Sequence, residues 1–400
     1  MSSIFESFLC TPEALAAFGD RSVVGAMLRF EAALARAQVS VGLIPATAAQ
    51  SIIASCELDL FDVSQIVRDS SRAGSVAIRL VKALKDRVGL LDLSAVAWTH
   101  FGSTSQDVID TAMALVTRDV LGLIQHDVRQ AAQALLSLAG QHAATPVLAR
   151  TLMQPGSVTS FGWKCAGWAA PLVRSLARLE TASAQALCVQ LGGAVGTLAS
   201  FKGQGVQVTA LVARDLGLRA PDAPWHTQRD EWLGLACELG LLVGSLGKIA
   251  KDIALMGQYE VGELAEPSEP GRGGSSAMPH KRNPVASMVA LAAAQRAPQR
   301  VATLLAAMPQ EHERALGGWQ AELAEWAQLV MCAHGAARAM AQALPGLQVK
   351  TARMRANIDT LAAQLPRDAA DEWFNPQLAD QAALLVLPRL AQLRMTLETI

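Results

Sequence analysis

The sequence predicts an all-α protein: a long-helix bundle with a small helical N-terminal domain and a shortened C-terminal helical tail. Three observations support this prediction. Hydrophobic residues make up 51% of the 400 residues and charged ones only 17%, and Ala and Leu, both good helix formers, dominate the apolar part. Apolar side chains recur every three or four residues over long stretches, whereas strand-like alternation is nearly absent. Helices of such length are unstable singly, so they must pack together.

Each expected element follows from the apolar spacing and from the loops that interrupt it. The spacing predicts a kink at Pro171 and a break or kink at Pro388, because proline lacks the amide hydrogen that a helix interior needs. The helix from 230 to 264 would be roughly 50 Å long. We place an N-terminal domain at 1–102, a central bundle at 103–345 and a tail at 346–400. The predicted helices span 21–43, 104–139, 162–189, 230–264, 284–308, 320–343 and 375–400.

Composition excludes several classes of function. The formal net charge is −1, so the chain has no overall basic field to hold nucleic acid. The apolar run from Leu233 to Met256 is interrupted by charged residues, which indicates a buried core helix and not a membrane span. The six cysteines are scattered without a Cys-x-x-Cys pair, as in a reduced, cytoplasmic protein. Neither a metal-ligand cluster nor a G-x-G-x-x-G dinucleotide motif stands out.

The segment from Glu266 to Pro284 is the most informative part of the chain. It is a Gly/Ser/Pro-rich loop that feeds a helix, and its glycines confer backbone freedom. Asn283 suits the N-cap of that helix and Pro284 its first position. With Lys281 beside it, the helix N-terminus would attract an anion. The pattern is typical of a mobile lid over a carboxylate substrate, although a solvated surface loop has the same composition.

The letters GSSAMPHKRNP, from Gly274 to Pro284, resemble the GSSxMPxKxNP signature of the fumarase/aspartase superfamily. The resemblance implies that Ser275 is the catalytic serine of a mobile loop and that Lys281 and Asn283 hold the reacting carboxylate. Reactions of this superfamily pass through a carbanion beside a carboxylate, whose charge spreads onto the oxygens as an aci-carboxylate. Lys281 and the Asn283 amide are donors suited to that developing charge.

A second segment, HFGSTSQDVIDTA from His100 to Ala112, resembles another conserved block of the superfamily. Thr104, Ser105 and Gln106 gather hydroxyl and amide groups at a helix start, which suits carboxylate binding and equally suits plain helix capping. His100 is a candidate acid/base or substrate ligand, although a single histidine is often structural.

A third segment, ARTLMQPGSVTSFGWK from Ala149 to Lys164, resembles the next block of the superfamily. Arg150, Thr151 and Gln154 match its substrate-binding positions. Many lyases of the superfamily carry a general-acid histidine after the threonine, where this chain has Leu152. An aliphatic side chain transfers no proton, so that lyase mechanism is not supported. The absence of this histidine is characteristic of the bacterial carboxymuconate cycloisomerases.

Further segments resemble the same cycloisomerases: 19–37, 224–232, 244–253 and 306–319. Within them, His226, Gln228, Arg229 and Arg314 are candidate partners for a substrate with several carboxylates. Each of the four also has an ordinary reading as a salt-bridge or core residue.

The resemblance implies a cofactor-free, metal-free enzyme that lactonises 3-carboxy-cis,cis-muconate, a step of protocatechuate breakdown. It also implies a homotetramer in which several subunits build each active site around a small polycarboxylate. Three alternatives remain open. They are lactonisation of 3-sulfomuconate, an adenylosuccinate-type lyase that releases fumarate, and a catalytically silent structural protein on the same scaffold.

Overall fold

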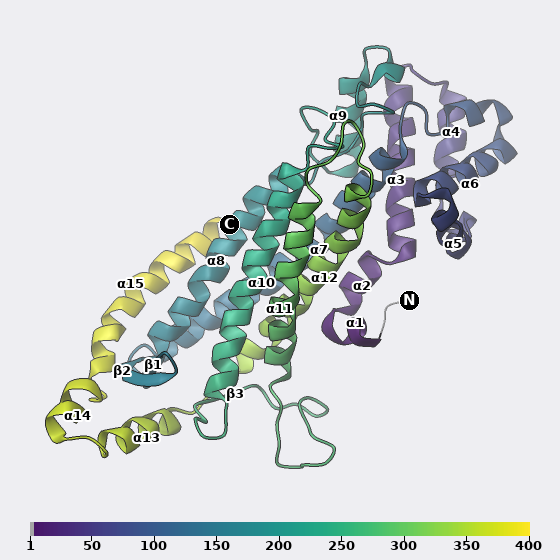
Figure 1. The fold of residues 1–400 in the computed structure, drawn as a ribbon. Coiled ribbons are helices and arrows are strands. Elements are labelled where there is room, and N and C mark those ends of the chain that lie inside the picture. The colour runs from purple at the N-terminus through teal and green to yellow at the C-terminus, as the bar shows by residue number, and fades with distance from the viewer. Residues whose placement is uncertain (1–3) are drawn as a thin grey trace.

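The computed structural model describes residues 4–400, so the first three residues of the expected N-terminal domain lie outside it. The prediction of an all-α fold is confirmed (Figure 1). The helices are α1 (Ile4–Leu9), α2 (Pro12–Ala17), α3 (Asp20–Ser40), α4 (Ala46–Ala54), α5 (Val63–Ala73), α6 (Val76–Leu91), α7 (Ser105–Gln141), α8 (Phe161–Ala186), α9 (Gly205–Leu216), α10 (Asp230–Met256), α11 (Val285–Ala306), α12 (Gly318–Ala343), α13 (Thr351–Ala362), α14 (Arg367–Trp373) and α15 (Leu378–Thr399). Short 3₁₀ turns are η1 (Leu58–Leu60), η2 (Leu93–Trp98), η3 (Ala199–Phe201) and η4 (Leu344–Gly346).

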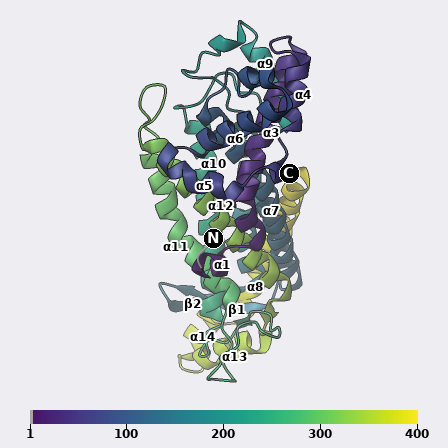
Figure 2. The same cartoon turned by 90° about the vertical axis from the view of Figure 1, so that its right-hand side faces the viewer.

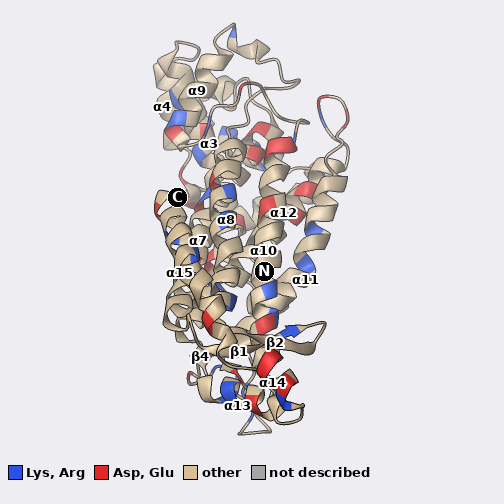
Figure 3. Cartoon of the chain, turned by 90° about the vertical axis from the view of Figure 1, so that its left-hand side faces the viewer, with Lys and Arg blue, Asp and Glu red and all other residues tan. Residues whose placement is uncertain are grey.

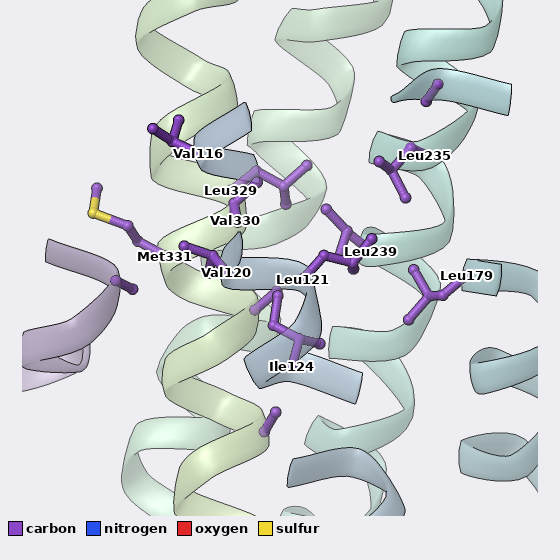
Figure 4. Close-up of a cluster of buried hydrophobic side chains, with 14 of the residues drawn as sticks. Val116, Val120, Leu121, Ile124, Leu179, Leu235, Leu239, Leu329, Val330 and Met331 are labelled. Atoms are coloured by element: carbon purple, nitrogen blue, oxygen red, sulfur yellow. The ribbon is translucent and has the colours of Figure 1, made fainter. Parts of the chain in front are cut away.

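Five long helices, α7, α8, α10, α11 and α12, form the bundle that sets the length of the molecule. The longest, α7, has 37 residues and is therefore roughly 55 Å long. Figure 4 shows one layer of the core, where Val120 and Ile124 of α7 meet Leu239 of α10 and Leu329 of α12. Removing such side chains from water is the main force that holds the helices together.

Helices α3 to α6 gather with α9 toward one end of the bundle, whereas α1 and α2 lie along its side, and α3 packs along both α7 and α9 (Figures 1 and 2). Their buried residues and those of the long helices belong to one continuous hydrophobic core that runs from Cys10 to Leu397. The expected domain boundaries at 102 and 345 therefore stay predictions.

At the opposite end lies a β-hairpin that the sequence patterns did not predict. Strands β1 (Pro146–Thr151) and β2 (Gln154–Ser160) pair antiparallel, with a register irregularity between Ala149 and Arg150. A second, minimal pair joins β3 (Leu264–Ala265) to β4 (Gln348–Val349). The hairpin connects α7 to α8 and carries the segment with Arg150, Thr151 and Gln154.

One helix end needs correction, and the helix around Pro388 has no break, so of the two possibilities there only a kink stays a prediction. The helix expected to run to Leu264 ends at Met256, because the chain turns at Gly257 and again at Gly262, whose φ is +62°. The C-terminal helix α15 passes through Pro388 without a break in its assigned residues. It returns along α8 and α7, and Arg129 Nη1 donates to the Leu397 carbonyl at 2.6 Å.

Helix α10 is apolar and long enough to cross a membrane by composition alone. In this fold it lies inside the bundle, where it packs against α8, α11 and α12. More than half of its most apolar stretch is buried by protein. Acidic and basic residues are interspersed along the bundle, without one dominant sign (Figure 3).

A fully buried arginine joins three elements near the N-terminal end of α7. The Arg229 guanidinium pairs with Asp110 of α7 at 2.8 Å and with Glu322 of α12. The same guanidinium stacks 4.3 Å above the Trp225 ring. Buried charges of this kind are tolerated only when their partners satisfy them.

We predict that Arg229→Met lowers the free energy of unfolding by about 3–5 kcal/mol, because two carboxylates are left buried without their cation. Urea unfolding at fixed protein concentration measures the change. The matched control is Arg21→Met, which removes the exposed pair with Asp59 and should change stability little. Equal unfolding midpoints for the two variants would contradict the prediction.

Candidate active site

One half of the candidate site lies at the N-terminal end of α7, where Asp107 gathers three separate segments. Its fully buried carboxylate accepts hydrogen bonds from the backbone amides of Thr104 at 3.0 Å, Gly192 at 3.1 Å and Gly193 at 3.0 Å. His226 Nε2 lies 2.6 Å from the same carboxylate. The predicted blocks around 100–112 and 224–232 therefore meet in one chain.

His100 sits directly before this cluster, in a strained backbone conformation. Its φ is +62°, which is uncommon for a residue other than glycine. Nδ1 lies 2.7 Å from Oε1 of the buried Glu31 on α3. Burial alone lowers the pKa of His100, but the carboxylate of Glu31, helped by Asp107, outweighs it and the pKa is raised. The geometry thus favours an imidazolium, a cation suited to a carboxylate ligand.

Thr104, Ser105 and Arg314 accompany His100 at this end. The two hydroxyl residues are half-buried at the start of α7. Arg314 reaches in from the loop between α11 and α12, and its Nη2 donates to the Gly193 carbonyl at 2.5 Å. Burial lowers the pKa of the Arg314 guanidinium, with Asp107 and Asp110 opposing that shift. A cation, hydroxyl groups and a helix start are together suited to binding a carboxylate.

Three residues that we expected to bind substrate directly have their polar groups engaged inside the fold. Gln106 is buried, and its Nε2 donates to Asp110 at 3.1 Å and to the His226 carbonyl at 2.9 Å. His226 is held by Asp107, and Arg229 by its two carboxylates. These contacts hold the three side chains in place within one chain, and their role toward substrate stays a prediction. Gln228 is exposed and lines a separate surface pocket of about 470 Å³.

The second half lies at the other end of the bundle, on the hairpin. Arg150 makes a two-pronged pair with the fully buried Glu263, at 2.9 and 2.8 Å, and Asn357 also donates to that carboxylate. The pair fixes the hairpin, close to its tip, to the chain after α10. Thr151 and Gln154 lie at the exposed tip.

The tip of the hairpin is both strained and apolar. Leu152 and Met153 have φ values of +49° and +66°, the sign pattern of a type I′ turn, which normally calls for Asn and Gly. Leu152 is 97% exposed and Met153 70% exposed. Strain and exposed apolar surface at one point are features that often mark a functional contact.

The signature loop lies beside the hairpin end, between β3 and α11 (Figure 1). The Ser275 hydroxyl accepts a hydrogen bond from the Met278 backbone amide at 3.1 Å, and the backbone amide of Asn283 donates to the Gly273 carbonyl at 2.7 Å. Lys281 is exposed. Asn283 lines a pocket of about 510 Å³ that also contains Arg272 and other residues at the base of the loop.

The expected cap of α11 needs correction. The helix begins at Val285 with Pro284 in the N-cap position, so Asn283 does not cap it. Instead, the Glu266 carboxylate accepts the amides of Ala286 at 2.9 Å and Ser287 at 2.8 Å, and the Ser287 hydroxyl at 2.7 Å. The helix N-terminus does attract an anion, but an internal carboxylate already occupies it.

The two halves are separated by the length of the bundle. Helix α10 begins beside Arg229 and ends just before the signature loop, and its 27 residues span roughly 40 Å. Ser275, Lys281 and Asn283 follow α10, whereas His100, Thr104 and Arg314 lie at the end where α10 begins, so the two sets do not meet within one chain. A small substrate cannot touch both halves of the same copy.

Sequence reasoning missed several carboxylates that organise the site. Glu31 lies within the matching segment 19–37, Asp107 within the block 100–112, and Glu266 begins the signature segment. Their presence in those segments was a usable signal. Glu263 offered none, because its pairing with Arg150 joins positions 113 residues apart.

Comparisons with known proteins agree with this architecture. Residues 9–298 match the sequence model of a protein family that is described as lyase. The chain is 44% identical over 357 residues to 3-carboxy-cis,cis-muconate cycloisomerase of Pseudomonas aeruginosa, covering 89% of this chain and 78% of that protein. It is 38% identical to nitrosuccinate lyase of Streptomyces davaonensis, covering 94% and 80%. The crystal structure of 3-carboxy-cis,cis-muconate lactonizing enzyme from Pseudomonas putida superposes with a TM-score of 0.90 at 36% identity, covering 99% of this chain and all of that one.

We predict that replacing Leu152 by Asn and Met153 by Gly raises the free energy of unfolding of the unassembled subunit by about 1 kcal/mol, because both new residues tolerate positive φ. Urea unfolding measures the gain. The matched control is Leu93→Asn, which removes an exposed leucine without relieving such strain. A turn variant no more stable than this control would show that the tip stores little strain.

Proposed function

The chain belongs to the lyase family of the fumarase/aspartase superfamily, and from this membership we propose that it lactonises 3-carboxy-cis,cis-muconate. The substrate is a small polycarboxylate, and the reaction is an intramolecular addition. One carboxylate oxygen attacks a conjugated alkene carbon of the same molecule. We further propose that the protein acts in the cytoplasm, in protocatechuate breakdown.

The observation that carries the proposal is Leu152. In a lyase that releases an amine, a general acid must protonate the leaving nitrogen. A carboxylate nucleophile carries no proton to lose, and as a leaving group in the reverse direction it needs none. Lactonisation therefore requires no titratable side chain at position 152, where this chain has an exposed leucine.

The same argument supports a second candidate. Nitrite is a weakly basic leaving group that departs without protonation, and nitrosuccinate lyase is among the similar proteins. Elimination of nitrite is therefore the alternative to test beside lactonisation of 3-sulfomuconate. Release of fumarate from adenylosuccinate is a weaker alternative, because its leaving group is an amine.

The proton balance of lactonisation assigns a role to the loop serine. The reaction forms one C–O bond and one C–H bond, and it converts three carboxylates into two carboxylates and a lactone. One proton is consumed in each turnover. In this proposal Ser275 delivers that proton to carbon and regains it from solvent, while Lys281 and Asn283 stabilise the aci-carboxylate. The tethered nucleophile leaves the protein chiefly to orient the substrate and hold charge.

A complete site needs more than one copy of the chain. The loop with Ser275 and the cluster with His100 lie at opposite ends of the bundle, so one copy must present its loop to the cluster of another. We propose a homotetramer with shared sites, in which Gln154 and the neighbouring hairpin tip come from a further copy. Exposed Lys281 and Leu152 are then covered on assembly.

We predict that Ser275→Ala lowers kcat on 3-carboxy-cis,cis-muconate by about a hundredfold or more, because the proton donor is removed. Loss of ultraviolet absorbance by the conjugated substrate measures turnover. Ser276→Ala, on the adjacent serine, is the matched control and should retain activity. Near-normal turnover by Ser275→Ala would remove the serine from this role. Turnover of nitrosuccinate, sulfomuconate or adenylosuccinate in place of carboxymuconate would replace the proposed substrate.

Mixing inactive subunits tests the shared site. We predict that His100→Asn and Ser275→Ala, each nearly inactive, regain measurable turnover when they are co-assembled, because hybrid sites combine the intact loop of one copy with the intact cluster of another. His100→Asn mixed with Thr104→Val is the control. Both defects then lie at the same end of the chain, so no site receives an intact cluster. If native mass spectrometry shows that His100→Asn and Ser275→Ala subunits form hybrid assemblies, and these hybrids stay inactive, the shared site is contradicted.

A further inference from the structure

Glu31 is a buried carboxylate whose partners do not account for its charge. It lies in the middle of α3 and is 1% exposed. Oε1 is 2.7 Å from His100 Nδ1, and Oε2 has no hydrogen-bond partner among residues 4–400. Leaving a buried carboxylate oxygen unpaired is costly, so purely structural carboxylates normally satisfy both oxygens. The cost suggests that the charge is kept for its effect on His100.

The backbone around His100 is held by the same helix. Two turns after Glu31, Gln38 Nε2 donates to the Phe101 carbonyl at 2.7 Å. The next residue, Gly102, has a φ of +73° and packs so closely on Phe201 that a Cβ there would come within 2.8 Å of the ring. Helix α3 thus supplies two contacts that keep His100 in its strained conformation. Such strain persists only where the surroundings enforce it.

The two ring nitrogens of His100 differ in their surroundings. Because Nδ1 faces Glu31, it carries the hydrogen, and Nε2 is the nitrogen left for another partner. No hydrogen bond occupies Nε2 in the described part of the chain, and the side chain is 15% exposed. Three charged groups from three packed elements act on the ring: Glu31 of α3, Asp107 of α7 and, more weakly and in opposition, Lys85 of α6.

We infer that Glu31 is the positioning residue for His100: it binds Nδ1–H and so presents Nε2–H to a carboxylate of the substrate. The inference rests on the proposed function for the identity of that substrate. Glu31 itself touches no substrate. Its carboxylate keeps His100 protonated and fixes the ring plane, as a buried carboxylate does for histidines at other sites.

The decisive variant is Glu31→Gln, which keeps the size of the side chain and removes the charge. Two readouts are taken on the assembled protein. The first is the pH titration of His100 followed by NMR of ¹³C-labelled histidine, assigned with His100→Asn among the seven histidines. The second is the pH profile of kcat/KM on 3-carboxy-cis,cis-muconate.

We expect the His100 titration and the alkaline limb of kcat/KM to move together to lower pH in Glu31→Gln. An imidazolium is required, and removing the carboxylate lets burial lower its pKa. At mildly alkaline pH, kcat/KM should fall about ten- to a hundredfold. Glu31→Asp, which keeps the charge, should recover part of this loss. The matched control is Asp127→Asn. Asp127 is also buried and lies 3.2 Å from His334 Nε2, but far along the bundle, so its loss should leave both readouts unchanged.

An unchanged His100 titration in Glu31→Gln would overturn the inference, as would a shift equally large in Asp127→Asn. If Glu31→Gln fails to fold by circular dichroism, Glu31→Asp carries the test, since its weakened contact must still lower the His100 titration. The NMR readout needs no turnover. A shifted titration in a protein inactive on carboxymuconate would therefore uphold the role of Glu31 while refuting the proposed function.

Discussion

The candidate site depends first on one buried carboxylate. Asp107 accepts backbone amides from the start of α7 and from the Gly192–Gly193 turn, and it holds His226 as well. Without it, the backbone amides of Thr104, Gly192 and Gly193 and the ring of His226 would lose their shared partner, and the spacing of these segments at the end of the bundle would be lost. The groups that can face a substrate, His100, Thr104 and Arg314, are arranged on this fixed base.

The second constraint is the length of the helices. Long helices give a large core from a sequence rich in Ala and Leu, but they also carry the chemical groups of one chain to opposite ends. The cluster around His100 and the signature loop each carry groups that can stabilise negative charge, and they lie at opposite ends of one chain. In the proposed assembly, the loop of one subunit lies against the cluster of another, so that each site is lined by different subunits.

Much of the fold could be predicted because helical periodicity is a local property. The bounds of α3, α7 and α12 fall within a few residues of those expected from apolar spacing. The hairpin was missed because its pairing is stabilised by the distant Glu263 contact and its turn uses Leu and Met where Asn and Gly are usual. The cap of α11 was misassigned because its carboxylate comes from Glu266, about twenty residues earlier. The signature residues were found from resemblance, whereas the engagement of Arg229 and His226 inside the fold required three-dimensional contacts.

The carboxylate of Glu266 also limits how the loop can move. It joins the beginning of the loop to the first turn of α11, which is where the loop ends. The backbone hydrogen bond from Asn283 to Gly273 brings the two sides of the loop together near the same point. These contacts close the loop at its base. Ser275 lies beyond this closed base, so the number of residues between 274 and 282 sets how far it can reach. Insertions or deletions there would change that reach without disturbing the bundle.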